Sequence, residues 1–346
     1  MKFFRKLTLL TLIAVYLLIM VGGIVRSTGS GMGCPDWPKC FGTWVPPTTV
    51  EQLPANYKEV YAAHREKKNI RFANYLEKMG MDATAEKIRN DKSILEEADF
   101  NATKTWVEYI NRVIGVIIGL MIFAVAITSI RFWTWDKKIT IIGFLTFFLV
   151  GFQGWIGSFV VSTNLTPWTV TVHMLLALVI VGLLVFLYFE STKDKQVRKV
   201  PYGLLLLTLC IVLLIVQIVL GTQVREAIDV AAASLLPRAT WIEASWASFV
   251  IHRTFSWLVL IVHVVLLRKL LKSEGSKILP YSLAVLILAT IVSGIGMAYF
   301  AIPAFLQPIH LTIASITVGL QFLLALQLNS GRREMLINQH VGARST

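Results

Sequence analysis

The sequence has 346 residues, of which 55% are hydrophobic and only 15% are charged, and its mean hydropathy is +0.67. A soluble domain carries about 25% charged residues, so this composition excludes an ordinary soluble protein and indicates an integral membrane protein. The net charge of +13 does not indicate nucleic-acid binding, because the sequence has no separate basic domain and no basic patch with interleaved aromatic residues. Lys and Arg collect instead at the ends of apolar runs, where they set topology and meet anionic lipid.

Eight segments are long and apolar enough to cross a bilayer, which takes about 20 helical residues. In chain order they are 7–26, 107–130, 139–161, 168–189, 202–224, 247–267, 279–301 and 307–328. The first segment follows a short basic N-terminus and resembles a signal peptide, but no small-residue cleavage site precedes a mature domain. We therefore expect this segment to be retained as the first transmembrane helix.

The basic residues of the short loops predict the orientation of the helices. They lie at the N-terminus, after the second, fourth and sixth segments and in the C-terminal tail, as Lys2, Arg5, Lys6, Arg131, Lys137, Lys138, Lys193, Lys195, Arg198, Lys199, Arg268, Lys269, Lys272, Lys277, Arg332 and Arg333. The alternate loops 162–167 and 302–306 have none. We expect a multi-pass protein of the cell membrane with both termini cytoplasmic. The 27–106 loop is expected to be extracytoplasmic and to form a helical hairpin broken near Gly80.

An internal repeat divides the chain into two tandem halves of four spans each. The matches, in order, are Gly22-Gly-Ile-Val-Arg26 with Gly221-Thr-Gln-Val-Arg225, Asn111-Arg112 with His252-Arg253, Gly154-Trp-Ile-Gly157 with Ser293-Gly-Ile-Gly296, and His173 with His310. The fold class expected is an all-α integral membrane protein whose eight helices form two tandem four-helix bundles. The halves are 1–190 and 191–330, followed by a cytoplasmic tail at 331–346, and each bundle can hold a ligand in its core.

Three histidines, His173, His252 and His310, lie inside even-numbered spans at one depth, about 6–9 Å below the outer boundary at 1.5 Å per residue. Ionisable residues within spans are rare and usually functional. One histidine from each of two facing helices supplies the axial nitrogens that a heme iron needs. The alternative for each is a polar residue that is hydrogen bonded between helices. The other histidines are expected to serve helix packing or to lie on the surface: His263, His64 and His340.

Glu108 lies at the outer end of the second span, one turn before Asn111, and residues three apart share a helix face. A carboxylate beside a ligand site is suited to proton transfer, so Glu108 is a candidate catalytic residue. The alternative is an acid at the N-terminal end of a helix, where the helix dipole favours it.

Four arginines lie close to the repeated motifs. Arg112 and Arg253 follow Asn111 and His252 directly, whereas Arg26 and Arg225 close the first and fifth spans. A guanidinium binds a carboxylate such as a heme propionate in a forked geometry. The alternative is anchoring of the helix at the membrane interface, which we favour for at least two of the four.

The loop Cys34-Pro-Asp-Trp-Pro-Lys-Cys40 lies on the side of the membrane that we expect to be oxidising. Prolines bend this segment, so Cys34 and Cys40 can close a small disulfide loop that is structural or redox-active. A metal site would need more ligands nearby. Cys210 lies in an apolar run and is expected to pack, and the absence of a CxxCH motif gives no indication of covalently attached heme.

Together these residues resemble the heme A synthase family. The stretch from Gly22 to Cys40 is similar to the first-helix and first-loop signature of that family. Glu108-Tyr-Ile-Asn-Arg112 is similar to its second-helix motif, and His252-Arg253 to its sixth. The tandem layout of eight helices matches as well, so the resemblance covers nearly the whole chain apart from 51–100.

The resemblance implies an oxidoreductase that converts a methyl group of heme O, through hydroxylation, to the formyl group of heme A for terminal oxidases. It implies a heme b held by His252 and His310, and heme O bound in the first half with His173 as its iron ligand and Glu108 near the reacting site. Cys34 and Cys40 would be the extracytoplasmic cysteine pair of the family. Heme O synthase and terminal oxidase assembly factors are the implied partners.

Asn111 departs from the family pattern, which often has histidine at this position. Asn is a poor heme ligand, so the substrate heme is five-coordinate, takes water or another residue, or the first half has lost catalysis. A second hypothesis is therefore a heme b electron-transfer cytochrome with a silent first half. A third is a transporter, which predicts no heme and broken helices at the bilayer midplane.

Overall fold

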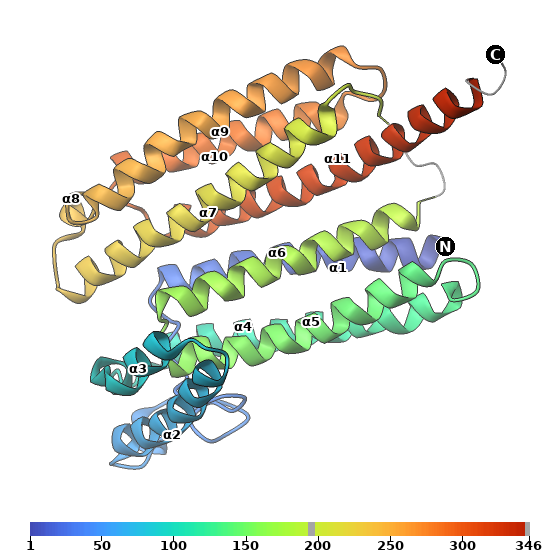
Figure 1. Cartoon of the computed structure of the whole chain (residues 1–346). Coiled ribbons are helices and arrows are strands. Elements are labelled where there is room, and N and C mark those ends of the chain that lie inside the picture. The colour runs from blue at the N-terminus through green and yellow to red at the C-terminus, as the bar shows by residue number, and fades with distance from the viewer. Residues whose placement is uncertain (193–197, 343–346) are drawn as a thin grey trace.

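The computed structural model describes residues 1–192 and 198–342, and eight of its helices are long and apolar enough to cross a membrane (Figure 1). They are α1 (Lys2–Ser27), α4 (Ala102–Ser129), α5 (Lys137–Ser162), α6 (Pro167–Glu190), α7 (Gly203–Ala233), α9 (Trp246–Lys272), α10 (Ile278–Tyr299) and α11 (Leu306–Gly342). The shorter elements are η1 (Val50–Gln52), α2 (Tyr57–Lys78), α3 (Asp82–Asn90), η2 (Lys92–Leu95), η3 (Ile130–Phe132), η4 (Arg238–Thr240) and α8 (Trp241–Ala244). No strand occurs among the described residues, so the predicted all-α membrane fold with eight spans is confirmed.

The starts of three spans follow from local capping chemistry. The Asn101 side chain accepts a hydrogen bond of 3.0 Å from the backbone nitrogen of Lys104, and Asp136 accepts one of 3.0 Å from that of Lys138. These side chains replace partners that the first turn of a helix lacks. Pro167 begins α6, where its fixed φ suits the first helical position and its missing N–H costs nothing.

α7 is longer than its apolar run predicts. The expected span ends at residue 224, but the helix continues to Ala233. The extension is rich in alanine and carries an ion pair of 2.7 Å between Arg225 and Asp229, one turn apart. Good helix formers and such pairs sustain a helix after its apolar run has ended, because helix formation does not require hydropathy. The connection that we expected over 225–246 is therefore largely helical.

α11 also continues past the expected end of its span at residue 328 and runs to Gly342. Most of the segment predicted as a tail is thus helical. Lys193 and Lys195, on which part of the predicted orientation depends, lie outside the described residues. The side chains of Arg332, Arg333 and His340 also lie outside the described part of the chain. The orientation of the protein in the membrane stays a prediction.

The transmembrane helices are arranged so that each even-numbered span has a diagonal counterpart. α4 and α6 each contact both α1 and α5, and α9 and α11 each contact both α7 and α10. We call α1, α4, α5 and α6 the first helix set, and α7, α9, α10 and α11 the second (Figure 1). Within each set, the two helices that carry the predicted site residues therefore lie opposite one another.

The two sets also pack against each other, through α11 with α1 and α6, and through α6 with α7. Two glycines permit a close approach of α1 and α11. A Cβ at Gly23 would lie 2.8 Å from the Cβ of Pro308, and the Tyr16 hydroxyl lies directly against Gly319. The division of the chain into two separate bundles stays a prediction.

Residues 28–101 gather at one end of the first helix set, which we call the loop end (Figure 1). The predicted hairpin is present: α2 and α3 meet at a break where Gly80 has a φ of +76°. This left-handed conformation favours glycine. α2 packs on the loop end of α5 and α6, since the Phe72 ring stacks on Phe159 at 3.9 Å and on Trp168 at 5.9 Å between ring centroids.

Candidate functional site

His252 of α9 lies against a glycine of the adjacent helix α7. A Cβ at Gly221 would lie 3.2 Å from the His252 Cε1 atom, closer than a side chain normally packs. The Gln217 side-chain nitrogen, one turn earlier on α7, donates to the His252 carbonyl oxygen at 3.0 Å and lies 3.2 Å from its ring Nδ1. The imidazole is thus held between a flat glycine surface and a polar side chain.

His310 of α11 has an equivalent setting on α10. A Cβ at Gly294 would lie 3.4 Å from the His310 Cε1 atom, and the Ser293 hydroxyl lies 2.9 Å from its Nδ1. The hydrogen bond to Nδ1 fixes the ring orientation and leaves Nε2 for another partner. His252 and His310 lie on α9 and α11, and both of these helices contact α7 and α10. The structure therefore places these two predicted ligands on diagonally opposite helices.

The first helix set has one histidine in the same kind of setting. A Cβ at Gly157 of α5 would lie 3.3 Å from the Cε1 of His173, and the Gln153 amide donates to the His173 carbonyl oxygen at 2.9 Å. In the described part of the chain, the His173 Nδ1 is buried without a hydrogen-bond partner. An orphaned ring nitrogen in an apolar helix set is costly, and this cost favours a bound group that satisfies it.

The glycine contacts refine the internal repeat. Gly157 and Gly294 are separated along the chain by the same distance as His173 and His310, and each glycine contacts its histidine. The sequence match had paired Gly157 with Gly296 instead. Gly157 is therefore structurally equivalent to Gly294, about half a helical turn from the Gly296 of the sequence match. The contact with the imidazole, rather than the match of residue types, identifies the equivalent glycine.

Asn111 of α4 occupies the position that corresponds to His252 but has a different setting. Its Oδ1 atom is buried without a hydrogen-bond partner among the described residues. A Cβ at Gly22, which corresponds to Gly221, would meet no heavy atom of the described chain within 4 Å. The first set thus has open space and an unsatisfied amide where the second has a packed imidazole.

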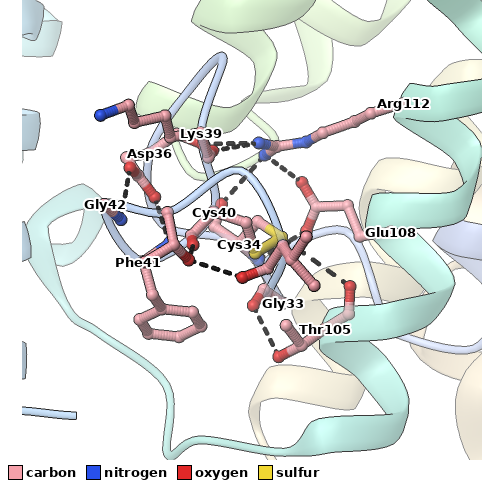
Figure 2. Close-up of a disulfide and its surroundings, with 12 residues drawn as sticks. Gly33, Cys34, Asp36, Lys39, Cys40, Phe41, Gly42, Thr105, Glu108 and Arg112 are labelled. Carbon is pink, nitrogen blue, oxygen red and sulfur yellow. Dashed lines mark hydrogen bonds and ion pairs between the residues drawn. A yellow bond between two sulfur atoms is a disulfide. The ribbon is translucent and has the colours of Figure 1, made fainter. Parts of the chain in front are cut away.

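Glu108 of α4 is buried beneath the loop that Cys34 and Cys40 close (Figure 2). Its Oε2 accepts a 2.9 Å hydrogen bond from the Cys34 backbone nitrogen, and its Oε1 forms a 2.6 Å ion pair with the Arg112 Nη2. α4 begins at Ala102 and has no acidic residue in its first turn. The alternative interpretation of Glu108 as a helix-terminal acid is therefore wrong: the carboxylate is held by a loop and an arginine.

Arg112 connects the same loop to α4. Its Nη1 donates to the backbone oxygens of Asp36 at 2.6 Å and Lys39 at 2.8 Å, and its Nη2 donates to that of Cys34 at 3.1 Å (Figure 2). With the ion pair to Glu108, these contacts engage both terminal nitrogens of the guanidinium. Arg112 thus positions the loop, and a propionate would have to share or displace these contacts.

The predicted disulfide between Cys34 and Cys40 is present, with a Cα–Cα distance of 4.9 Å. Among the described residues, no group of three or more His, Cys, Asp or Glu could hold a metal ion, so the alternative of a metal site in this loop has no support. The loop lies very close to α4, because a Cβ at Gly33 would be 2.5 Å from the Lys104 carbonyl oxygen. Cys210 is buried and unpaired, as the sequence predicts for a packing residue.

The remaining predicted arginines differ in their surroundings. Arg253 is exposed, lies 5.6 Å from the centre of the Phe249 ring and has no ion-pair partner among the described residues. Arg26 and Arg225 both bind Asp229, at 2.9 and 2.7 Å. These ion pairs join the loop ends of α1 and α7 through Asp229, whereas Arg253 has no such partner among the described residues.

The family model of cytochrome oxidase assembly proteins, COX15-CtaA, matches residues 5–322, which include His173, His252, His310 and the Cys34–Cys40 loop. The chain belongs to this family. A similar protein is the heme A synthase of Shewanella oneidensis, which is 26% identical over 231 residues, 66% of this chain and 58% of that protein. The heme A synthase of Rickettsia felis is 24% identical over 347 residues, 91% of this chain and 95% of that protein.

A third relative, the heme A synthase of Pelagibacter ubique, is 29% identical over 230 residues, 63% of this chain and 60% of that protein. The matches therefore span about three fifths of the Shewanella and Pelagibacter proteins and nearly all of the Rickettsia protein. Family membership agrees with the resemblance seen in the motifs from Gly22 to Cys40 and from Glu108 to Arg112.

In this family member, sequence reasoning missed the polar partners of the histidines. Gln153 and Gln217 each lie four residues before the glycine that contacts a histidine, Gly157 and Gly221. An amide inside an apolar span was a usable signal, because polar residues there are rare. Ser293 offered no comparable signal, since serine is common in transmembrane helices.

Two of the other histidines, His263 and His64, lie where the sequence predicts. His263 is fully buried, and both of its ring nitrogens are engaged: Nδ1 lies 2.6 Å from the Val259 carbonyl oxygen and Nε2 lies 2.5 Å from the Gln321 amide. It joins α9 to α11 as a packing residue. His64 is exposed on α2.

Proposed function

We propose that the protein is a membrane oxidoreductase that converts heme O to heme A for terminal oxidase assembly. The change replaces two hydrogens of a methyl group with one oxygen to give a formyl group, a four-electron oxidation that needs an external electron acceptor. The observation that carries the proposal is the setting of His173, His252 and His310 on glycines of both helix sets, within a chain that one family model matches almost throughout. The names of the relatives, heme A synthase, support the same reaction.

The second helix set would hold a resident heme b. The residues present fit such a group, because Gly221 and Gly294 leave room for the imidazoles of His252 and His310, and polar side chains, Gln217 and Ser293, contact both rings. Bound heme supplies one-electron redox chemistry. Arg253, which is exposed and lacks a carboxylate partner among the described residues, would bind a propionate.

The first helix set would bind the substrate heme. His173, with its unpartnered Nδ1, would be the protein ligand of the substrate iron, and Asn111 leaves the opposite face without a histidine. Glu108 would exchange a proton with the reacting group, since it is a buried carboxylate on the same helix as Asn111. Arg112 and the Cys34–Cys40 loop would keep this carboxylate in place.

We also place the loop end on the extracytoplasmic side of a cell membrane. Basic residues collect at the opposite end of the helices, where Arg131, Lys137 and Lys272 lie. A disulfide at the loop end suits an oxidising compartment. Heme O synthase is the partner that would supply the substrate.

A heme b electron-transfer cytochrome is the second candidate, and Asn111 favours it. If the first set cannot bind heme without a histidine at this position, only the heme b of the second set remains. The protein would then carry electrons without changing a porphyrin.

The test is to express the protein in a host that makes heme O but has no heme A synthase, and to identify extracted hemes by mass. We expect heme A or its hydroxylated precursor in cells that contain the protein and neither in cells that lack it. Heme O alone, beside a folded protein with its heme b spectrum, would contradict the enzyme and favour the cytochrome.

A further inference from the structure

Lys68 of α2 holds a half-buried ammonium group at the loop end of the first helix set. Its Nζ donates a 3.1 Å hydrogen bond to the Ser158 carbonyl oxygen of α5. The same atom lies 5.7 Å from the centre of the Phe159 ring and 6.0 Å from that of the Trp37 ring. A carbonyl and two ring faces therefore hold the cation where α2 meets α5.

In the described part of the chain Lys68 makes no close ion pair, and the charge of Asp36 acts on it only from a longer distance. Among the described residues, no carboxylate lies within ion-pair distance of Lys68. The nearby Asp36 carboxylate accepts hydrogen bonds from the backbone nitrogens of Phe41 at 2.6 Å and Gly42 at 2.9 Å, so it is already engaged. Burial and the neighbouring Arg112 guanidinium lower the pKa of Lys68 to about 8. An ammonium in this position stays charged at neutral pH and gains from a bound anion.

The location of Lys68 indicates which anion it would bind. Ser158 directly follows Gly157, the glycine that contacts His173, and lies on its loop-end side. Arg112, which affects Lys68 electrostatically, directly follows Asn111. Lys68 thus contacts α5 one residue beyond the glycine that lies against His173. A porphyrin in an apolar helix set keeps its carboxylates toward a polar boundary, because a carboxylate is costly to bury in hydrocarbon.

We propose that Lys68 binds a propionate carboxylate of the porphyrin substrate, so that the α2 hairpin is part of the substrate site. The inference rests on the proposed function. The ammonium exchanges the Ser158 carbonyl for a carboxylate oxygen, and a hydrogen bond between two charged groups is stronger than the one it replaces. The aromatic contacts with Phe159 and Trp37 hold the side chain in place for this exchange. The 51–100 segment thereby has a role in recognition.

The test compares Lys68→Met with Lys67→Met in the purified protein that retains its resident heme. Methionine keeps the apolar stem of the side chain and removes its charge, and Lys67 is an exposed neighbour on the same helix. The probes are hemin and its dimethyl ester, in which both propionates are esterified. Absorbance titration gives the dissociation constant of each probe, and the resident heme spectrum and thermal unfolding check that each variant is folded.

We expect Lys68→Met to raise the dissociation constant of hemin about tenfold, in line with the loss of one hydrogen bond between charged groups. The ester should bind equally to the original protein and to Lys68→Met, and Lys67→Met should change neither probe. Unchanged hemin binding in Lys68→Met would overturn the proposal. So would equal losses for hemin and ester, or the absence of any hemin binding beyond the resident heme.

Turnover does not enter this titration, so its failure is separable from failure of the proposed function. If the original protein makes no heme A but Lys68→Met weakens hemin binding, the proposed reaction is contradicted and the carboxylate site at Lys68 is supported. A protein that makes heme A while Lys68→Met binds hemin normally would retain the reaction and remove the site.

Discussion

The two helix sets carry different residues at equivalent positions. In the second set, His252 and His310 lie on diagonally opposite helices, each against a glycine and each with a polar partner. In the first set only His173 has this setting, and Asn111 occupies the other position with an unsatisfied oxygen. A complete pair of ligands suits a heme that stays bound, whereas an incomplete pair suits one that must enter, react and leave.

The two helix sets also differ in what covers them at the loop end. The first set is covered by the disulfide loop and by α2, and Glu108 and Arg112 are engaged with that loop. On the second set the corresponding arginine, Arg253, is exposed. Under the proposed function, the second set would keep its heme permanently, and the first set would bind its heme beneath a covered, charged loop end.

The largest effect should come from removing a ligand of the second set. His252→Ala or His310→Ala should abolish the low-spin heme b spectrum, because each removes one axial nitrogen. The absorbance spectrum of the reduced purified protein measures this. His64→Ala is the control, since His64 is exposed on α2 and should leave the spectrum intact. A normal spectrum in either variant would contradict the proposal that His252 and His310 bind heme b.

Glu108→Gln should affect the function of the first helix set and leave the second helix set unchanged. It removes the charge beneath the disulfide loop and the group proposed to move a proton, so turnover should fall by about 10²-fold or more. The heme b of the second set should remain. Glu226→Gln, at an exposed carboxylate of α7, is the control. Heme A formation at the original rate in Glu108→Gln would show that the carboxylate is not needed for the reaction.

A pair of glycine variants tests the asymmetry directly. Gly221→Ala adds a methyl group 3.2 Å from the His252 ring, whereas Gly22→Ala adds one to open space. Overpacking costs about 1–3 kcal/mol, so Gly221→Ala should weaken heme b retention by about fivefold or more. Gly22→Ala should leave it unchanged. Equal retention in both variants, measured as heme per protein after dialysis against apomyoglobin, would argue that the glycine contact does not position the imidazole.

The smallest effect concerns the junction between the sets. Asp229→Asn removes the carboxylate that both Arg26 and Arg225 bind, and it should lower stability by about 1 kcal/mol, because the group is partly exposed. Thermal unfolding in detergent measures this change, with the exposed Asp82→Asn as control. No change in unfolding temperature would mean that packing of α11 against α1 and α6 alone holds the sets together.

The fold could largely be predicted from the sequence because apolar length determines which segments span a bilayer. The extension of α7 to Ala233 was not predicted, because Arg225, Glu226 and Asp229 interrupt the apolar run while the chain stays helical. The hairpin break near Gly80 was predictable, because glycine is the residue that accepts the left-handed conformation there. Helix ends defined by charge and capping are visible in a sequence only where the capping residue is distinctive.

Site residues could be predicted where a polar or reactive side chain lies in a sequence segment of different character. Histidines inside apolar runs are conspicuous, as are two cysteines with prolines between them, and the disulfide between Cys34 and Cys40 is present. Contacts between distant segments were not predictable. Arg112 binds the loop, and Lys68 binds the Ser158 carbonyl oxygen. Both contacts join residues far apart in the sequence, so no local sequence pattern predicts them.

The central claim is that the two sets hold different hemes, and mass analysis of extracted hemes from two variants tests it most directly. His310→Ala and His173→Ala would each be purified from a host that makes heme O. The account predicts that His310→Ala loses heme b and keeps heme O or its oxidised products, and that His173→Ala does the reverse. Loss of the same heme from both variants would contradict it.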